Sequence, residues 1–330
     1  MNVIKMNKPV YVAGTAAVVG KREHEGPLGA DFDMHDESEK FGMDTWEKAE
    51  SEMQRRALSL ALINAGMGST TPDAIFAGDL MNQCTGSAYG LLDFGVPYFG
   101  LYGACSTFAE SMMLSALMVN AGYFNTCAAV TSSHFCTAER QFRFPLEYGG
   151  QRTPTSQRTA TASGAAIICA QSSENVMIEE VLPGRIIDKG ITDINNMGAA
   201  MAPAAIDTLT RYFEDTGKKP DDFDMILTGD LGMEGHGIVN DMMLASGIDL
   251  HRVYNACGLL LYNLKSQDMH AGGSGCGCGA SVIAGHIMKR MRRGELKNVL
   301  FLATGALMSP GSVFQGLSIP AIAHLVHFSA

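Results

Sequence analysis

The stretch that decides the fold is PDAIFAGDL, residues 72–80, because its pattern returns as FDMILTGDL at residues 223–231. In both stretches a short apolar run ends in Gly-Asp-Leu, which is typical of a buried strand that turns sharply at its end. The elements around the two stretches follow one another in the same order. Each half is too long for a solenoid repeat, so the sequence indicates a duplicated domain.

The two halves are predicted to contain the same kinds of strands and helices. In the first half we expect strands at 9–19, 74–77, 98–101, 126–131 and 165–170, a helix capped by Thr45 and a helix ending at Gly122. In the second half we expect strands at 176–181, 224–228, 299–304 and 322–328, a helix at 201–213 and a helix from the Gly-rich stretch 272–279 to Gly294. The polar stretch 171–175 separates the halves, which we place at 1–171 and 172–330.

Two predicted helices, one after Cys105 and one after Cys276, are apolar almost all round. This composition places both helices in the interior, between two sheets. Two βαβαβ halves with paired central helices form an α/β protein with αβαβα layers. This arrangement is the thiolase-like fold.

The composition excludes several classes of function. The net charge of -10 argues against binding to nucleic acid or directly to an anionic membrane surface. No apolar run is long enough to cross a bilayer, and the first eight residues do not resemble a signal peptide, so we expect a chain that is cytoplasmic at synthesis. The eight cysteines lack a disulfide or zinc spacing, and the acidic stretch 31–39 lacks the spacing of an EF-hand loop, so we expect no metal site.

Cys105 is the first candidate for chemistry. It stands where a predicted strand turns into a helix, directly after Gly103 and Ala104. At a helix N-terminus the backbone N–H groups and the helix dipole favour a thiolate, and the same N–H groups can hold an oxyanion during acyl transfer. The alternative is a small buried cysteine that packs the start of the helix.

Acyl-condensing enzymes with this fold need more than a thiol. They use a His after the second strand of the second half, where this chain has Asp230, and a further His or Asn, for which residues 275–278 offer no amide. Because an ionised carboxylate cannot donate to an oxyanion, these substitutions argue against condensation. His324 and His236, and more distantly His134, are candidate partners for Cys105, or else ordinary packed histidines.

Arg140 and Arg143 form a second candidate constellation. The planar guanidinium binds carboxylates through two parallel hydrogen bonds, so two arginines near a pocket would suit a dicarboxylate. The alternative is a pair of structural salt bridges, for instance with Glu139 or Glu147.

Several strings in both halves resemble the stage V sporulation protein AD family. They cover essentially the whole chain: residues 14–17, 25–29, 77–80, 103–107, 131–134, 137–143, 227–231, 257–260, 271–276, 303–307 and 322–324.

The resemblance implies a role in sporulation. The family is associated with moving dipicolinic acid (pyridine-2,6-dicarboxylate) into the developing spore with membrane proteins of the stage V sporulation A operon. It implies a binding protein rather than an enzyme, peripheral association with the spore inner membrane, a homodimer, and no cofactor except calcium together with dipicolinate. The alternative is a thiolase or ketosynthase-type acyltransferase with Cys105 as nucleophile and His324 as its partner. The expected ligand-binding residues are Cys105, Asp79, Asn82, Arg140, Arg143, Asp230, Gly273, Ser274 and His324.

Overall fold

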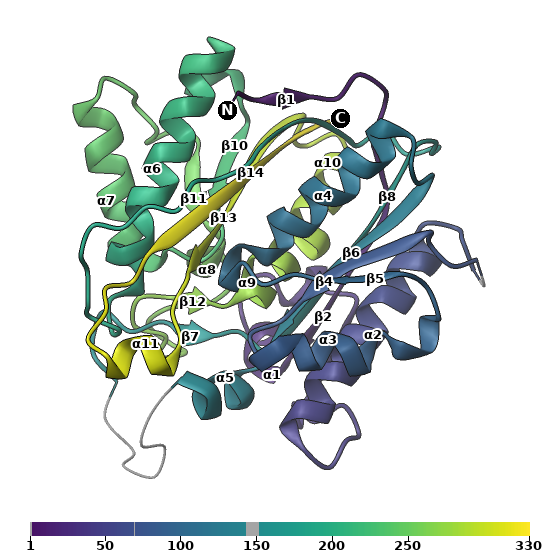
Figure 1. Cartoon of the computed structure of the whole chain (residues 1–330), viewed down its shortest axis with the longest axis horizontal. Helices are drawn as coiled ribbons and strands as arrows, with labels where there is room; N and C mark the ends of the chain where they lie inside the picture. The colour runs from purple at the N-terminus through teal and green to yellow at the C-terminus, as the bar shows by residue number, and fades with distance from the viewer. Residues whose placement is uncertain (1, 69, 143–151) are drawn as a thin grey trace.

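The computed structural model describes residues 2–68, 70–142 and 152–330 (Figure 1). Within these ranges the two halves repeat one strand arrangement. The strands of the first half are β2 (Tyr11–Gly20), β4 (Ala74–Gly78), β5 (Tyr98–Gly100), β6 (Thr126–Ser133) and β8 (Ala162–Cys169). Those of the second half are β9 (Met177–Leu182), β10 (Met225–Thr228), β11 (Tyr254–Ala256), β13 (Asn298–Ala306) and β14 (Ala321–Ser329). The order is β5-β4-β6-β8-β2 in one half and β11-β10-β13-β14-β9 in the other.

The pairing directions are also repeated. In each half the second strand is parallel to the third and fourth, and the fifth is antiparallel to the fourth and first. Short strands extend the sheet, because β1 (Ile4–Lys5) pairs with β9 and β3 (Met34–Asp36) pairs with β2. A separate pair, β7 (Arg158–Thr159) with β12 (Gly273–Ser274), links the halves.

The predicted two sheets are the two halves of one continuous sheet. Tyr11 of β2 pairs with Met177 of β9, and this contact joins the first strands of both halves. The central helices still lie between the halves, as predicted. The core that surrounds them contains residues from both, including Phe76, Phe108 and Phe301.

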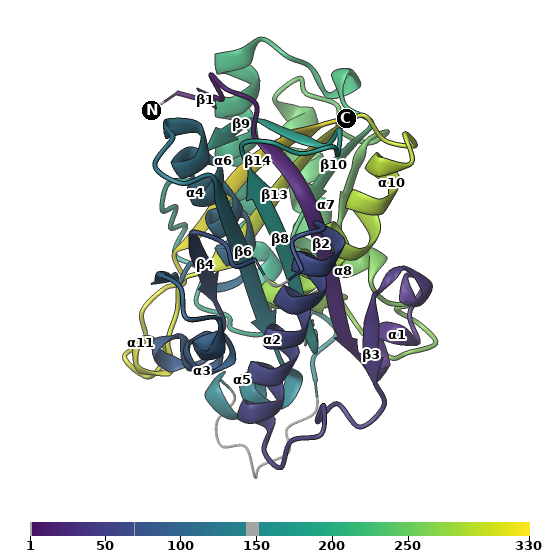
Figure 2. The ribbon, with the colours of Figure 1, turned by 90° about the vertical axis from the view of Figure 1, so that its right-hand side faces the viewer.

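The helices form three layers around the sheet (Figures 1 and 2). α2 (Trp46–Asn64) and α3 (Thr85–Gly90) cover the outer side of the first half, and α6 (Met197–Thr216) and α7 (Gly232–Ala245) cover that of the second. α4 (Thr107–Ala121), α9 (Cys276–Ser281) and α10 (Met288–Arg292) lie in the middle. The shorter helices are α1 (Lys21–His24), α5 (Phe135–Phe142), α8 (Cys257–Leu260) and α11 (Pro310–Phe314).

The second central helix is not the uniform α-helix that the sequence predicts. A π-helical stretch, η7 (Val282–Ile287), separates α9 from α10. The hydroxyl of Thr15, from the other half, donates to the carbonyl of Ala284 at 2.9 Å. This bond takes up a carbonyl of the widened turn, which helps to explain why it is tolerated.

Local signals in the sequence account for several boundaries. The Thr45 hydroxyl accepts a hydrogen bond from the backbone N–H of Lys48 at 3.3 Å and so caps α2 as predicted. All eight cysteines lie in the described ranges and all are free. Among the described helices, none is long and apolar enough to cross a membrane.

Candidate functional site

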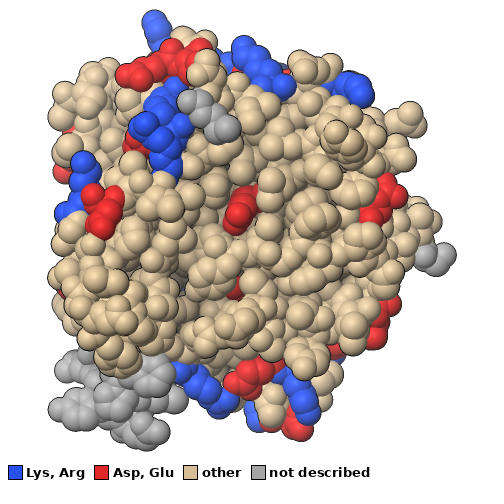
Figure 3. Space-filling view, viewed as in Figure 1, with Lys and Arg blue, Asp and Glu red and all other residues tan. Residues whose placement is uncertain are grey.

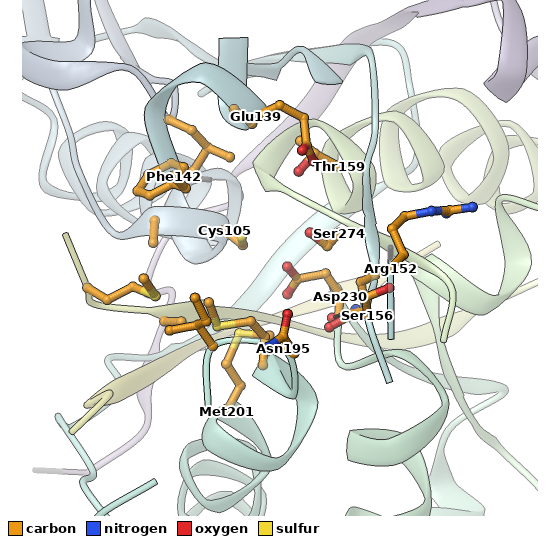
Figure 4. A pocket seen from close by; sticks show the side chains of 18 of the residues that line it. Cys105, Glu139, Phe142, Arg152, Ser156, Thr159, Asn195, Met201, Asp230 and Ser274 are labelled. Atoms are coloured by element: carbon orange, nitrogen blue, oxygen red, sulfur yellow. Dashed lines mark hydrogen bonds between the residues drawn. The ribbon is translucent and has the colours of Figure 1, made fainter. Parts of the chain in front are cut away.

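A cavity of about 330 Å³ lies where the two halves meet (Figure 4). Cys105 reaches it from the turn before α4, Asp230 from the end of β10, and Ser274 from β12. α5 contributes Ala138, Glu139 and Phe142, while the remaining side comes from residues 152–159, 194–201 and 306–308. The lining therefore combines apolar walls with a few polar groups, which is typical of a small-molecule site.

The backbone before Cys105 is held in a tight turn. Ala104 has a φ of 50°, a left-handed conformation that is unfavourable for a residue other than glycine. The hydroxyl of Ser106 donates to the carbonyl of Gly103 at 2.6 Å, which fixes the turn. Gly305 of β13 permits the close approach, since a Cβ atom there would lie 2.1 Å from the same carbonyl oxygen.

Asp230 is a buried acid beside this turn, with a relative exposure of 1 %. Its Oδ1 accepts a hydrogen bond from the hydroxyl of Thr304 at 2.9 Å, and its Oδ2 accepts one from the backbone N–H of Gly275 at 3.2 Å. Burial raises the pKa of Asp230 to about 6, although hydrogen bonds from Cys105, Thr304 and Gly275 act in the opposite direction. The carboxyl is therefore poised to change its charge near neutral pH.

The thiol of Cys105 is poorly suited to act as a thiolate. Burial raises its pKa well above the usual value for cysteine, and the neighbouring negative charge of Asp230 raises it further. The N–H of Ser106, at the start of the helix, is already bound by the Gly103 carbonyl. This surrounding favours a neutral thiol that donates a hydrogen bond.

The three candidate histidine partners lie outside the cavity lining. The ring of His324 accepts a hydrogen bond from the N–H of Gly184 at 3.2 Å, and burial lowers its pKa to about 4. His134 contacts the carbonyl of Glu39 at 2.9 Å, and His236 stacks on Tyr254. All nine histidines are in the described ranges and none lines the cavity, so the described lining lacks the base that would activate Cys105.

The Gly-rich helix start offers fewer free N–H groups than the sequence indicates. The N–H of Gly275 binds Asp230, that of Gly277 binds the hydroxyl of Ser133 at 3.2 Å, and that of Cys278 binds the carbonyl of Gly275. Gly273 lies in β12, where its carbonyl accepts a hydrogen bond from the Gln157 amide at 2.9 Å. Within this segment, the Ser274 side chain is the group that lines the cavity.

The comparisons with known proteins agree with this architecture. A family model described as "Stage V sporulation protein AD (SpoVAD)" matches residues 1–329. Stage V sporulation protein AD of Bacillus subtilis (strain 168) is 41% identical over 320 residues, which cover 97% of this chain and 94% of that protein. The chain belongs to the stage V sporulation protein AD family.

Solved structures show the fold that this family member shares. A variant of OleA from Xanthomonas campestris has a TM-score of 0.61 and 14% identity, covering 98% of this chain and 99% of that one. 3-Oxoacyl-[acyl-carrier-protein] synthase III of Aquifex aeolicus VF5 has a TM-score of 0.57 and 13% identity, covering 96% and 99%. At this identity the likeness establishes the thiolase-like fold alone.

The expected arginine pair does not converge on the cavity of this family member as described. Arg140 forms an ion pair with Glu47 on the surface and does not line the cavity, and Arg143 lies outside the described residues. Asn82, also outside the lining, accepts a hydrogen bond from Gln141 at 2.6 Å. The expectation of a structural salt bridge thus holds for Arg140, with Glu47 in place of Glu139 or Glu147.

Asp79 is enclosed in its own half. Its Oδ1 accepts from the N–H of Met81 at 2.9 Å, and its Oδ2 accepts from the N–H and the hydroxyl of Ser87, each at 2.7 Å. Nearby, Glu50 accepts from the hydroxyls of Ser132 and Thr137 at 3.0 and 2.6 Å. Burial and the charge of Asp79 raise the pKa of Glu50 to about 8. Asp79 therefore belongs to a buried polar cluster behind the cavity.

Residues 152–159 supply much of the polar lining, and sequence reasoning missed them. Arg152 lines the cavity, but its guanidinium points away from the cavity centre (Figure 4) and binds Asp268 at 2.8 Å. Gln157 donates to the carbonyls of Asp230 and Gly273, which leaves its buried Oε1 without a partner. The segment is polar and lacks a periodic pattern, so only a structure can bring it to the cavity.

Proposed function

We propose that this protein binds dipicolinic acid in the Cys105 cavity and assists its uptake into the developing spore. Membership of the family supports the sporulation role. The observation that carries the binding role is a small enclosed cavity whose cysteine is neutral and lacks a histidine partner in the described lining. Such a cavity can hold a ligand without transforming it.

The polar groups of the cavity suit a planar acid. Ser274, Ser156, Thr159 and Asn195 can donate hydrogen bonds to carboxylate oxygens, and Tyr102 and Met201 offer apolar contact to a ring. Burying two carboxylates without such donors would cost several kcal/mol. The ligand would therefore be held by neutral donors more than by ion pairs.

Calorimetry with dipicolinate tests this proposal. Benzene-1,3-dicarboxylate, which lacks the ring nitrogen, serves as the matched ligand. Ser274→Ala should weaken binding about tenfold, because a hydrogen bond to a charged group contributes roughly 1.5–3 kcal/mol. Ser266→Ala, an exposed serine outside the lining, is the control. Folded protein that binds neither ligand would contradict the proposal.

Arg140 and calcium each give a further arm of the same experiment. If Arg140 contacts the ligand, Arg140→Ala loses about tenfold in affinity, whereas the ion pair with Glu47 predicts no change. Among the described residues, no group of three or more His, Cys, Asp or Glu could hold a metal ion. Calcium would thus be bound chiefly through the carboxylates of dipicolinate, and titrations with and without calcium measure its contribution.

The second candidate function is acyl transfer. The position of Cys105 at a helix start inside the cavity favours it, and the solved relatives of similar fold include a 3-oxoacyl-[acyl-carrier-protein] synthase III. Incubation with acyl-CoA followed by mass spectrometry would detect a Cys105 thioester, with Cys105→Ala as control. The raised pKa of Cys105 predicts no such adduct.

The surface supports assembly with a second copy and with membrane partners of the same operon. β5 ends the sheet and exposes Tyr98 and Phe99. Figure 3 shows few charged side chains in the middle of this face of the molecule. An apolar edge strand is a favourable surface for pairing between copies. Light scattering should give a dimer mass, and fractionation of sporulating cells should place the protein with the inner membrane only when those membrane partners are present.

A further inference from the structure

Asp230 is placed against the ligand in a way that conflicts with an anionic guest. Its carboxyl points into the cavity toward Cys105 (Figure 4), while the side chain is almost fully buried. An ionised Asp230 beside a dicarboxylate would put like charges together in a poorly solvated space. Such an arrangement is unfavourable unless a cation or a proton intervenes.

No cation of the described residues supplies that compensation. Arg152 is the only Lys or Arg of the described lining, and its guanidinium binds the carboxylate and the carbonyl of Asp268 at 2.8 and 2.9 Å. The other ionisable groups that face Asp230 are acids or thiols. They are Cys105 before α4, Cys257 on α8, Cys276 and Cys278 on α9, and Glu139 on α5 across the cavity.

The hydrogen bonds of Asp230 leave room for a proton. A carboxylate offers about four lone-pair positions. Three donors approach Asp230, namely Thr304, the N–H of Gly275 and the Cys105 thiol. One position stays open, and a carboxylic acid there becomes a hydrogen-bond donor. The pKa of about 6, raised by burial, means that this proton is gained at little cost near neutral pH.

We propose that Asp230 binds the dicarboxylate as a neutral carboxylic acid, so that each bound ligand brings one proton into the site. This inference rests on the proposed ligand-binding function. The proton comes from solvent or buffer, adds to a carboxylate oxygen of Asp230 and forms a hydrogen bond to a ligand carboxylate. No other bond is made or broken. Asp230 thereby selects ligands that accept a hydrogen bond and makes their affinity fall as the pH rises.

Calorimetry with dipicolinate between pH 6 and pH 8 tests the inference. One linked proton weakens the affinity by up to tenfold per pH unit above the pKa of the free site, and therefore by up to about 100-fold over this range. In buffers with different heats of ionisation, the observed enthalpy at pH 8 should report uptake of about one proton per ligand. Asp230→Asn, which mimics the neutral acid, should bind with the same affinity at both pH values, within about threefold of wild type at pH 6.

The matched control is Glu23→Gln. Glu23 is another buried acid, with a pKa raised to about 7 by burial, but it does not line the cavity. This variant should keep the pH slope of wild type, and any slope that remains in Asp230→Asn measures titration of the ligand itself. Wild type that binds with a flat pH profile would overturn this inference and leave the proposed function in place. Absence of binding by wild type and Asp230→Asn at every pH would overturn both.

Discussion

Asp79 and Asp230 occupy the same position in the two halves, each in a Gly-Asp-Leu turn after the second strand, yet their surroundings differ. Asp79 accepts three hydrogen bonds from Met81 and Ser87, residues close to it in the chain, and is sealed inside the first half. Asp230 is held by Thr304 and Gly275, which are distant in the chain, and lines the cavity. Duplication thus provided two equivalent acids, and the segments after the strands separated a structural role from a ligand-binding one.

Substituting both acids by asparagine should break the symmetry most strongly. In Asp79→Asn, the N–H groups of Met81 and Ser87 approach different oxygens, so one of them must face the new NH₂ group. A buried unsatisfied donor costs about 1–3 kcal/mol, and two opposed donors should cost about 3 kcal/mol. In Asp230→Asn, the Thr304 hydroxyl can turn to accept, so the stability should change by less than about 1 kcal/mol. Urea denaturation measures both, and equal losses would contradict the distinction.

Glu50 sharpens the comparison, because it is a buried acid beside Asp79 whose pKa of about 8 is raised by burial. A folded-state pKa above the unfolded value of 4.5 means that the contribution to stability is complete below about pH 4.5 and is lost as the pH rises through 8. Glu50→Gln removes this loss. The variant should gain about 2 kcal/mol relative to wild type between pH 5 and pH 8. Parallel stability curves for the two proteins would show that Glu50 titrates normally.

The cysteines at the two central helix starts provide a smaller contrast. Cys105 is half-buried and faces the cavity, whereas Cys276 is fully buried and its thiol donates to the carbonyl of Ser132 at 2.9 Å. At pH 7.5, iodoacetamide should modify Cys105 at least tenfold more slowly than a free cysteine, because its pKa is raised, and should leave Cys276 unmodified. Mass spectrometry with and without dipicolinate measures this. Rapid labelling of Cys105 would revive the nucleophile hypothesis.

The fold was predictable from the sequence because each half repeats short apolar runs that end at glycine. The repeat also predicts that Cys105 and Asp230 lie near each other, since both follow strands of related position. The joining of the two predicted sheets was not predictable. It depends on the pairing of Tyr11 with Met177, two residues whose local sequence carries no sign of it.

The remaining site residues depend on contacts between distant segments. Arg140 turns toward Glu47, a residue of α2, and no local pattern announces that pair. His324 stands in a strand whose side chains are buried on both faces, so the sequence does not reveal which face it occupies. The lining from residues 152–159 lacks both an apolar period and a known motif, and for this reason it was missed.

The π-helical stretch at residues 282–287 also bears on how the chain tolerates insertions and deletions. A wide turn of this kind accommodates one extra residue in an α-helix. Removing one residue there would rotate everything that follows by about 100° about the helix axis. Lys289 and Arg292 would then turn away from Asp33 and Glu174, their present ion-pair partners. The length of this segment is therefore expected to be fixed even where its individual residues vary.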